Sequence, residues 1–351
     1  MNTPPCMRLL FGLGCCLPAF LSGTAAGGRQ PLAPPRAVTQ LSVQVERHGE
    51  SARPSADERR LAAGDWSAPG SEPGTVATAL LAAPFRGTPA RAYVAVLVEA
   101  DGSALWAGSS PASLPVEIYA VAVARDGAIA DSFSQTLRLD LGKAGAAPRR
   151  SGFKFFGHLE LPAGEYSLRV LVRNTETGSF GVRAAALTVP AFTADQPVLL
   201  SPFFPEWDGR WAMVREPPRG EQRDVPYPFV IGKRAYVPAA LPALSPGKSS
   251  AVALVGYNLG EGRLEARAKV QSADGRELAG GELRLGGREP GGGGQPAVLR
   301  AVFRPPYLAP GDYRLVITVN GAAGTQIGTS RFAIAAPGSG RSGRAGKGGG
   351  G

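Results

Sequence analysis

The chain has 351 residues, 44% of them apolar, with 48 Gly, 32 Pro, few aromatics (7%) and a net charge of +10. Many turn residues between short apolar runs predict all-β domains, and the length allows two of ordinary size. All three cysteines (Cys6, Cys15, Cys16) precede residue 17, so removal of a leader would exclude disulfides, thiolate nucleophiles and Cys-liganded metals.

Residues 1–26 are predicted to be a signal peptide. Arg8 supplies a positive start, Leu9–Leu21 is an apolar run, and small residues at Gly23–Ala26 suit cleavage. The run is too short for a bilayer span and contains Pro18, so we expect an exported protein, periplasmic or extracellular, without a transmembrane segment. Lipoprotein anchoring through Cys15 or Cys16 is the alternative, but the residues before each cysteine fit that cleavage site less well.

Residues 27–74 are predicted to be a Pro/Gly-rich linker with a short strand-like run at 37–45 and a helical turn near 57–63. A first β-sandwich is predicted over 75–200, with strands at 91–98, 116–123, 132–141, 153–161 and within 161–190. Asp126-Gly127 predicts a hairpin in which both central residues have positive φ. His158 alternates away from Phe155 and Leu159, which predicts an exposed position.

Residues 201–226 are predicted to be an aromatic and Pro-rich connector. A second sandwich is expected over 227–336, with strands at 251–257, 264–270, around Leu283 and Leu285, and at 298–303; Gly/Ser/Arg-rich residues 337–351 form a disordered tail. The second sandwich carries 13 basic and 7 acidic residues. This excess would suit an anionic surface or envelope polymer, although an Arg-biased composition is the favoured explanation; no nucleic acid partner is expected.

One segment occurs twice. Leu161–Pro190 recurs as Leu308–Pro337, an offset of 147 residues, and both copies open with Leu-x-x-Gly-acid-Tyr-x-Leu. Self-similarity at a fixed offset indicates one structural unit used twice. We expect Gly164 and Gly311 to allow a tight turn, and Tyr166 and Tyr313 to return their hydroxyls to it. Such a tyrosine is typical of immunoglobulin-like sandwiches. The sequence therefore predicts two tandem antiparallel immunoglobulin/fibronectin-like β-sandwiches.

Leu161–Pro190 followed by Leu199-Leu200-Ser201 resembles the C-terminal region of bacterial secreted proteins that carry a von Willebrand factor A-related domain. Leu80–Phe85 and Arg91–Val94 are similar to the region just after that domain, so the resemblance covers about residues 75–240. It implies only a β-rich accessory region. The A domain itself is absent, because the chain has no Asp-x-Ser-x-Ser motif and no space for its α/β fold.

The sequence offers little for catalysis. The two histidines, His48 and His158, provide neither a zinc ligand set nor a triad with a Gly-x-Ser-x-Gly elbow. Gly247-Lys248-Ser249 lacks the earlier glycine of a phosphate loop, where Pro242 stands. Ca²⁺ ligation by Asp101, Asp126 and Asp131 competes with simple roles in turns. We therefore predict no catalytic residues, no metal and no cofactor.

Two kinds of function remain. The first is a secreted, non-catalytic module that contacts an unknown protein or envelope polymer. The alternative is a carbohydrate-binding module, in which exposed Trp207, Trp211 or Trp106 would stack on sugar rings, unless these rings are buried between the sandwiches. A hydrolase is the remote alternative, because it would need a carboxylate pair that the sequence does not identify.

Overall fold

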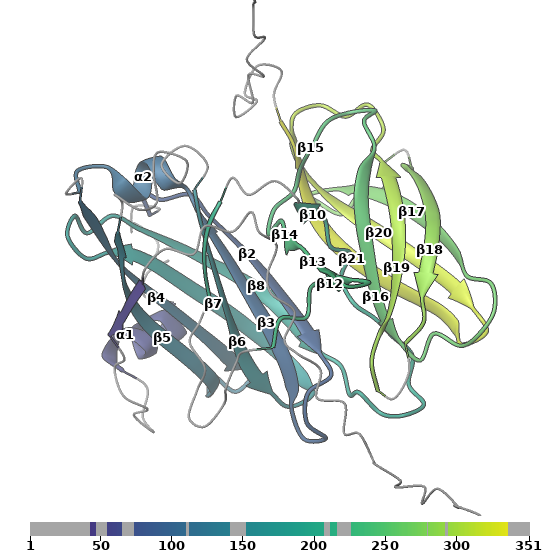
Figure 1. Ribbon diagram of the computed structural model, residues 1–351, viewed down its shortest axis with the longest axis horizontal. Coiled ribbons are helices and arrows are strands. Elements are labelled where there is room, and N and C mark those ends of the chain that lie inside the picture. The colour runs from purple at the N-terminus through teal and green to yellow at the C-terminus, as the bar shows by residue number, and fades with distance from the viewer. Residues whose placement is uncertain are drawn as a thin grey trace, which may run out of the picture. The chain divides into compact units, whose positions relative to one another are not determined.

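The computed structural model describes residues 43–46, 55–64, 74–109, 112–140, 152–206, 211–215, 226–278, 280–291 and 294–335. The predicted signal peptide and tail lie outside these residues. Within them, the chain is all-β apart from two short helices and forms two immunoglobulin-like sandwiches (Figure 1). The strands pair antiparallel except for β11 with β6 and β15 with β21, which are short parallel pairs.

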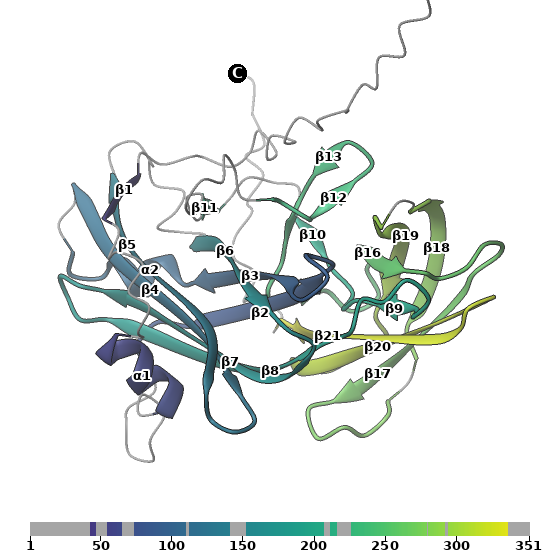
Figure 2. The same cartoon turned by 90° about the horizontal axis from the view of Figure 1, so that it is seen from below.

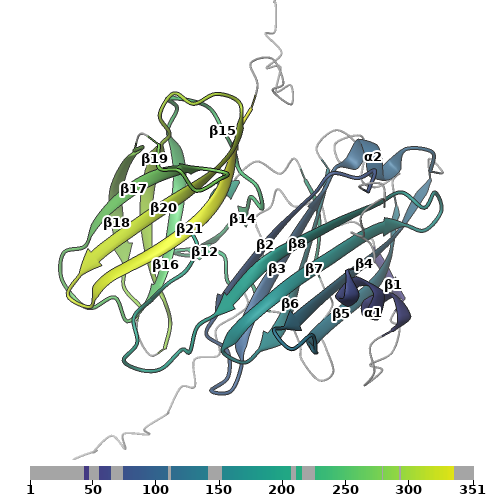
Figure 3. The ribbon, with the colours of Figure 1, turned by 180° about the vertical axis from the view of Figure 1, so that it is seen from behind.

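The first sandwich packs a five-stranded sheet, ordered β1-β5-β4-β7-β8, against a four-stranded sheet, ordered β11-β6-β3-β2. Its strands are β1 (Val43–Glu46), β2 (Thr78–Phe85), β3 (Ala92–Ala100), β4 (Ser113–Ala124), β5 (Ile129–Asp140), β6 (Phe153–Leu161), β7 (Gly164–Asn174), β8 (Phe180–Val189) and β11 (Ala212–Arg215). Helix α2 (Gly102–Trp106) follows β3, and helix α1 (Ala56–Ala63) lies against the five-stranded sheet (Figure 3).

The second sandwich packs two four-stranded sheets, ordered β15-β21-β20-β17 and β18-β19-β16-β9. Its strands are β9 (Val198–Leu199), β15 (Ala243–Leu244), β16 (Ser250–Tyr257), β17 (Glu265–Ser272), β18 (Glu282–Glu289), β19 (Ala297–Arg304), β20 (Gly311–Gly321) and β21 (Gly324–Ile334). Two small ladders complete the described strands: β10 (Pro205–Glu206) with β14 (Val237–Pro238), and β12 (Val230–Ile231) with β13 (Arg234–Ala235), of which the second is seen as a hairpin in Figure 2.

The two sandwiches differ in topology at one strand, which belongs to one sheet in the first sandwich and to the opposite sheet in the second. In the first, β5 continues the hairpin from β4 and stays in the same sheet. In the second, the corresponding strand β18 pairs with β19 instead, so the chain crosses to the opposite sheet after β17. The second arrangement matches the constant-type immunoglobulin order of four and three strands, extended by β15.

The predicted hairpin turns have a different conformation from the expected one. Gly127 and Gly275 have φ of +86° and +87°, whereas the only described non-glycine residue with positive φ is Asn258. The expectation of positive φ at the preceding aspartates was therefore wrong. At the first turn Gly127 N donates to Ala124 O (3.0 Å) and Ala124 N to Ala128 O (2.8 Å). This pattern is a three-residue turn that ends in a left-handed glycine, and it recurs at residues 272–276.

The repeated motif closes both sandwiches in the same way. The hydroxyl of Tyr166 donates to Pro162 O (3.0 Å), and that of Tyr313 donates to Ala309 O (2.7 Å). A Cβ added at Gly164 would lie 3.3 Å from the Tyr166 hydroxyl, and one at Gly311 would lie 3.8 Å from that of Tyr313. Each tyrosine therefore folds back over its glycine and fastens the turn, as the motif predicts.

We expect Tyr166→Phe and Tyr313→Phe each to lower the free energy of unfolding by about 1 kcal/mol, because each removes one hydrogen bond and leaves a backbone carbonyl with one partner fewer. Chemical denaturation measures the change. Tyr307→Phe is the control, since the Tyr307 side chain is 83% exposed and its loss of a hydroxyl should leave stability unchanged. Equal stability of all three variants would contradict the role of the two hydroxyls.

The connector supplies strands to both sandwiches. Val198–Leu199, predicted to lie at the end of the first sandwich, forms β9 and pairs with β16 of the second. Ala212–Arg215, in the predicted connector, forms β11 and pairs with β6 of the first. Each sandwich nevertheless has its own core, one around Val96, Phe155 and Val170 and the other around Leu254, Phe303 and Ile317.

Candidate functional site

Of the three tryptophans predicted to bind sugars, the two that the structure describes do not form an exposed aromatic surface. Trp106 is 6% exposed and belongs to the core of the first sandwich, so its ring is not available as a surface platform. Trp207 lies outside the described residues. Trp211 is half-buried, and Lys154 Nζ lies 4.4 Å from the centre of its ring. The structure therefore does not bring Trp106 and Trp211 together as an exposed aromatic surface.

The most unusual polar group is Lys154, whose side chain is fully buried on β6. Its register partner on β3 is Glu99, and Lys154 Nζ lies 2.7 Å from Glu99 Oε1. Glu206 from β10 forms a second ion pair with the same nitrogen, and Pro238 O accepts from it at 3.2 Å. We call Lys154, Glu99, Glu206 and Trp211 the Lys154 cluster.

The Lys154 cluster holds the connector on the outer face of the first sandwich. Glu99 Oε1 also accepts from Ala240 N at 2.6 Å, so one carboxylate contacts β6 and the segment after β14. Burial raises the pKa of Glu99 above its ordinary value, and the positive charge of Lys154 opposes that rise. A cation enclosed by two carboxylates, a carbonyl and an indole is satisfied within the protein.

The prediction that His158 is exposed was wrong. His158 is 2% exposed, and its ring stacks on Tyr93 at a centroid distance of 4.8 Å. The alternation on β6 does place Lys154, Phe156 and His158 on the face opposite the core. That face is buried as well, because the connector covers it, and Tyr93 donates to Pro226 O at 2.7 Å.

An aromatic cluster continues this covered face. Phe229 lies at its centre, with ring centroids 5.6 Å from Phe85, 5.3 Å from Phe203 and 6.2 Å from Phe156. These rings come from β2, β6, the connector and the residue before β12, and Ala253 of β16 belongs to the same buried cluster. We call this group the junction cluster, because it joins the outer face of β2-β3-β6 to the connector and β16.

Tyrosines with raised pKa predict loss of stability at high pH. Burial raises the pKa of Tyr227, Tyr236 and Tyr257 around the junction, and it raises the pKa of Tyr119, which packs beside α1, to about 12. Below pH 10 these phenols are neutral in both states. Above it the unfolded phenols ionise first, so folding loses free energy as the pH rises through the folded pKa.

We expect the denaturant midpoint to fall steeply as the pH rises above 10, with phenolate absorbance increasing together with loss of the β-sheet circular dichroism signal. Tyr227→Phe should weaken this dependence, because one buried phenol no longer titrates. Tyr307→Phe is the matched control. Phenolate absorbance that rises fully while the fold stays intact would show that the buried phenols are accessible.

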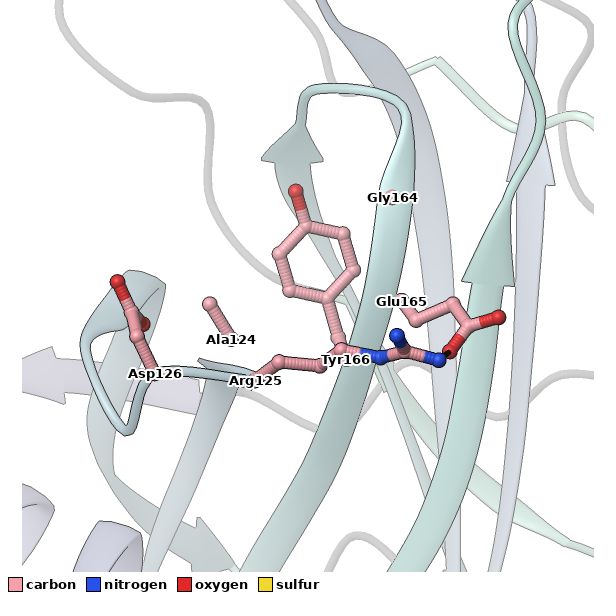
Figure 4. Close-up of a pocket in the computed structure, with 6 residues that line it drawn as sticks. All are labelled: Ala124, Arg125, Asp126, Gly164, Glu165 and Tyr166. Carbon is pink, nitrogen blue, oxygen red and sulfur yellow. Dashed lines mark hydrogen bonds and ion pairs between the residues drawn. The ribbon is translucent and has the colours of Figure 1, made fainter.

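An open pocket of about 350 Å³ lies at the start of β7 and the turn after β4. Its lining residues are Ala124, Arg125, Asp126, Gly164, Glu165 and Tyr166 (Figure 4). Arg125 and Glu165 point toward one another and form an ion pair, while the Tyr166 hydroxyl is bound to Pro162. The polar groups of this pocket are therefore engaged with the protein itself.

The three aspartates considered for Ca²⁺ each accept a hydrogen bond from a backbone N–H group. Asp101 caps α2 by accepting from Ala104 N (2.8 Å), Asp126 accepts from Ala128 N (3.0 Å), and Asp131 accepts from Glu160 N (2.7 Å). Within the described ranges, no group of three or more His, Cys, Asp or Glu side chains is placed to hold a metal. Nor does that part of the chain contain a helix long and apolar enough to cross a membrane.

Comparison with known proteins does not identify a family for this chain. No family model and no curated protein matches the chain. Among solved structures, it is similar to the BSP domain of a biofilm associated protein (10% identity, 74% of this chain, 29% of that one, TM-score 0.26). It is also similar to an ICAM-5 D1–D4 ectodomain fragment (13% identity, 74% and 53%, TM-score 0.19). The chain thus spans less than two thirds of either, and the resemblance to A-domain-related proteins stays a prediction.

Proposed function

We propose that the protein is an exported, non-catalytic two-sandwich module that makes structural contacts in the cell envelope or outside it. The observation that carries this proposal is that the groups best suited to chemistry are enclosed by packing. Lys154 is 0% exposed and His158 2%, and both lie under the connector. Glu99 and Glu206 have Lys154 between them, which leaves no space for the sugar and water that a glycosidase carboxylate pair needs.

The surface that fits a partner best is the outward face of β18 and β19. Arg284, Arg300 and Arg304 are exposed there, around the exposed Val302. Glu282 pairs with Arg284 and lies 4.0 Å from Arg304. We call these three arginines the arginine face. Three guanidinium groups on the outward face of two paired strands suit an anionic envelope polymer, because its charges repeat along one direction.

Retention on a heparin column tests the arginine face. We expect the variant R284A/R300A/R304A to elute at lower salt than the wild type, since exposed charge pairs are screened by salt. The matched control is R91A/R125A/R138A, which removes as many exposed charges from the first sandwich. Equal elution of the two variants would show that only net charge matters.

The non-catalytic proposal has its own test. If the wild type hydrolyses a glycosidic substrate and the Glu99→Gln variant does not, the proposal is contradicted.

A further inference from the structure

Helix α1 packs on the outer face of the five-stranded sheet, at an apolar site formed by Val121, Val123 and Leu171 that we call the seat. At the centre Leu61, 1% exposed, packs with Val121, Val123 and Leu171, all of them buried. Tyr119, Phe180 and Val182 surround this apolar contact, and α1 contacts β4, β5 and β7 (Figures 1 and 3). The apolar residues of the sheet would be exposed without the helix.

Two arginines on β7 recognise the two ends of α1. Arg173 lies at the N-terminal end, where Nη2 is 3.1 Å from Asp57 Oδ2, and its Nε donates to Glu117 Oε2 at 2.9 Å. Arg169 lies at the other end, where Nη1 donates to Leu61 O at 3.1 Å and also to Ala62 O. The positive charge of Arg169 lies at the negative, C-terminal end of the helix dipole. The acidic first turn lies at its positive, N-terminal end, where Asp57 also meets Arg173. The seat therefore fixes the direction of the helix as well as its apolar face.

The helix needs the seat in order to form. With eight residues α1 is too short to be stable alone in water. Its start is well specified, because Ser55 and Glu58 form a capping box in which Glu58 N donates to Ser55 Oγ (3.1 Å) and Ser55 N to Glu58 Oε2 (2.7 Å). The sequence thus encodes a helix start, and docking supplies the remaining stability.

The same stretch of chain makes a second contact with this sheet. Strand β1 pairs antiparallel with β5, from Val43 opposite Leu139 to Glu46 opposite Thr136. Strand β1 therefore covers the edge of this sheet and α1 covers its face; we call the stretch that carries both, residues 43–63, the N-terminal arm. An uncovered edge strand readily pairs with another chain.

We propose that the seat is an exchangeable docking site, filled by the N-terminal arm of a second copy of this chain when copies are crowded. The contacts are the same whichever copy supplies the arm, and exchange of an identical element is a low-cost route to dimers. Gly64 caps α1 and Val76 is already buried in the core of the first sandwich, so the ten-residue step from Gly64 to Gly74 can reach about 35 Å when extended. The tethered arm competes at an effective concentration of about millimolar, so exchange requires comparable crowding. This inference does not depend on the arginine face.

A charge-reversal pair separates exchange from docking within one chain. In Arg173→Glu the seat repels its own Asp57, and in Asp57→Arg the arm repels its own Arg173. When the two variants are mixed, each arm matches the seat of the other copy. We expect each variant alone to be monomeric and their equimolar mixture to double in mass by sedimentation equilibrium. The single-chain D57R/R173E variant restores the match within one copy and should be monomeric at the same concentration.

A mixture that stays monomeric would overturn the proposal. Should either variant fail to fold, the wild type at rising concentration provides the test. Its weight-average mass should increase toward that of a dimer as millimolar concentration is approached, and Leu61→Asp, which removes the apolar contact of the arm, should abolish the increase. A wild type that stays monomeric, or an equal increase in Leu61→Asp, would also overturn it.

Discussion

Replacing Lys154 by methionine is expected to lower the free energy of unfolding by about 3–5 kcal/mol, because it leaves buried carboxylates without their cation. Glu99 is the partner most affected, since it is 8% exposed and would keep the hydrogen bond from Ala240 N but lose its cation. Chemical denaturation at neutral pH measures the loss. Lys154→Met should also make stability fall as the pH rises, because an unpaired Glu99 folds best when protonated.

Two comparisons isolate the buried pair. Lys269→Met removes an exposed lysine, 57% exposed and 3.0 Å from Glu277, and should cost no more than about 1 kcal/mol. The double variant E99Q/K154M removes the unpaired charge and should recover part of the stability lost in Lys154→Met. If Lys154→Met and Lys269→Met were equally stable, the Lys154 cluster would not hold the connector in place.

Phe229→Ala is expected to lower the free energy of unfolding by about 3–5 kcal/mol, because it opens a cavity at the centre of the junction cluster. Phe229 is 1% exposed, and its ring also approaches Tyr227 (5.6 Å) and Tyr236 (6.0 Å) edge-on. Each sandwich retains its own core, so weakening the junction should uncouple their unfolding. We expect the single denaturation transition of the wild type to separate into two, one for each sandwich.

Tyr307→Ala is the matched control for Phe229→Ala. It removes a large ring of which 83% is exposed, and we expect a change within about 0.5 kcal/mol. Calorimetry shows whether one or two transitions occur. A single transition in Phe229→Ala with the stability of the wild type would mean that the sandwiches do not depend on the junction cluster.

Much of the fold follows from local sequence. The alternation around Tyr166 and Tyr313 predicts both terminal hairpins, and β7, β8, β20 and β21 form there. Asp-Gly predicts the position of each turn but not its type, because three-residue and two-residue turns both use a glycine with positive φ. The different sheet of β18 was not predictable, since Leu283 and Leu285 face the core from either sheet.

The Lys154 cluster was not predictable, for a related reason. Alternation on β6 shows that Phe155 faces the core and that Lys154 and His158 do not, which is correct. What covers the second face depends on Glu206 and residues beyond it, more than forty positions away in the chain. Trp106 illustrates the reverse case, because a tryptophan in a short polar loop is buried once α2 folds over the core.

The order of strands along the chain crosses between the two sandwiches. Strand β9, which belongs to the second, is followed by β11, which belongs to the first. No single cut can therefore yield two complete halves: ending a fragment before Val198 deprives the first of β11, and starting one after Arg215 deprives the second of β9. During synthesis the first sandwich must wait for Arg215 to leave the ribosome, by which time its neighbour already has its first strand. A gene fragment that encodes all of either sandwich therefore also encodes a strand of the other. We expect the two sandwiches to be inherited together for this reason.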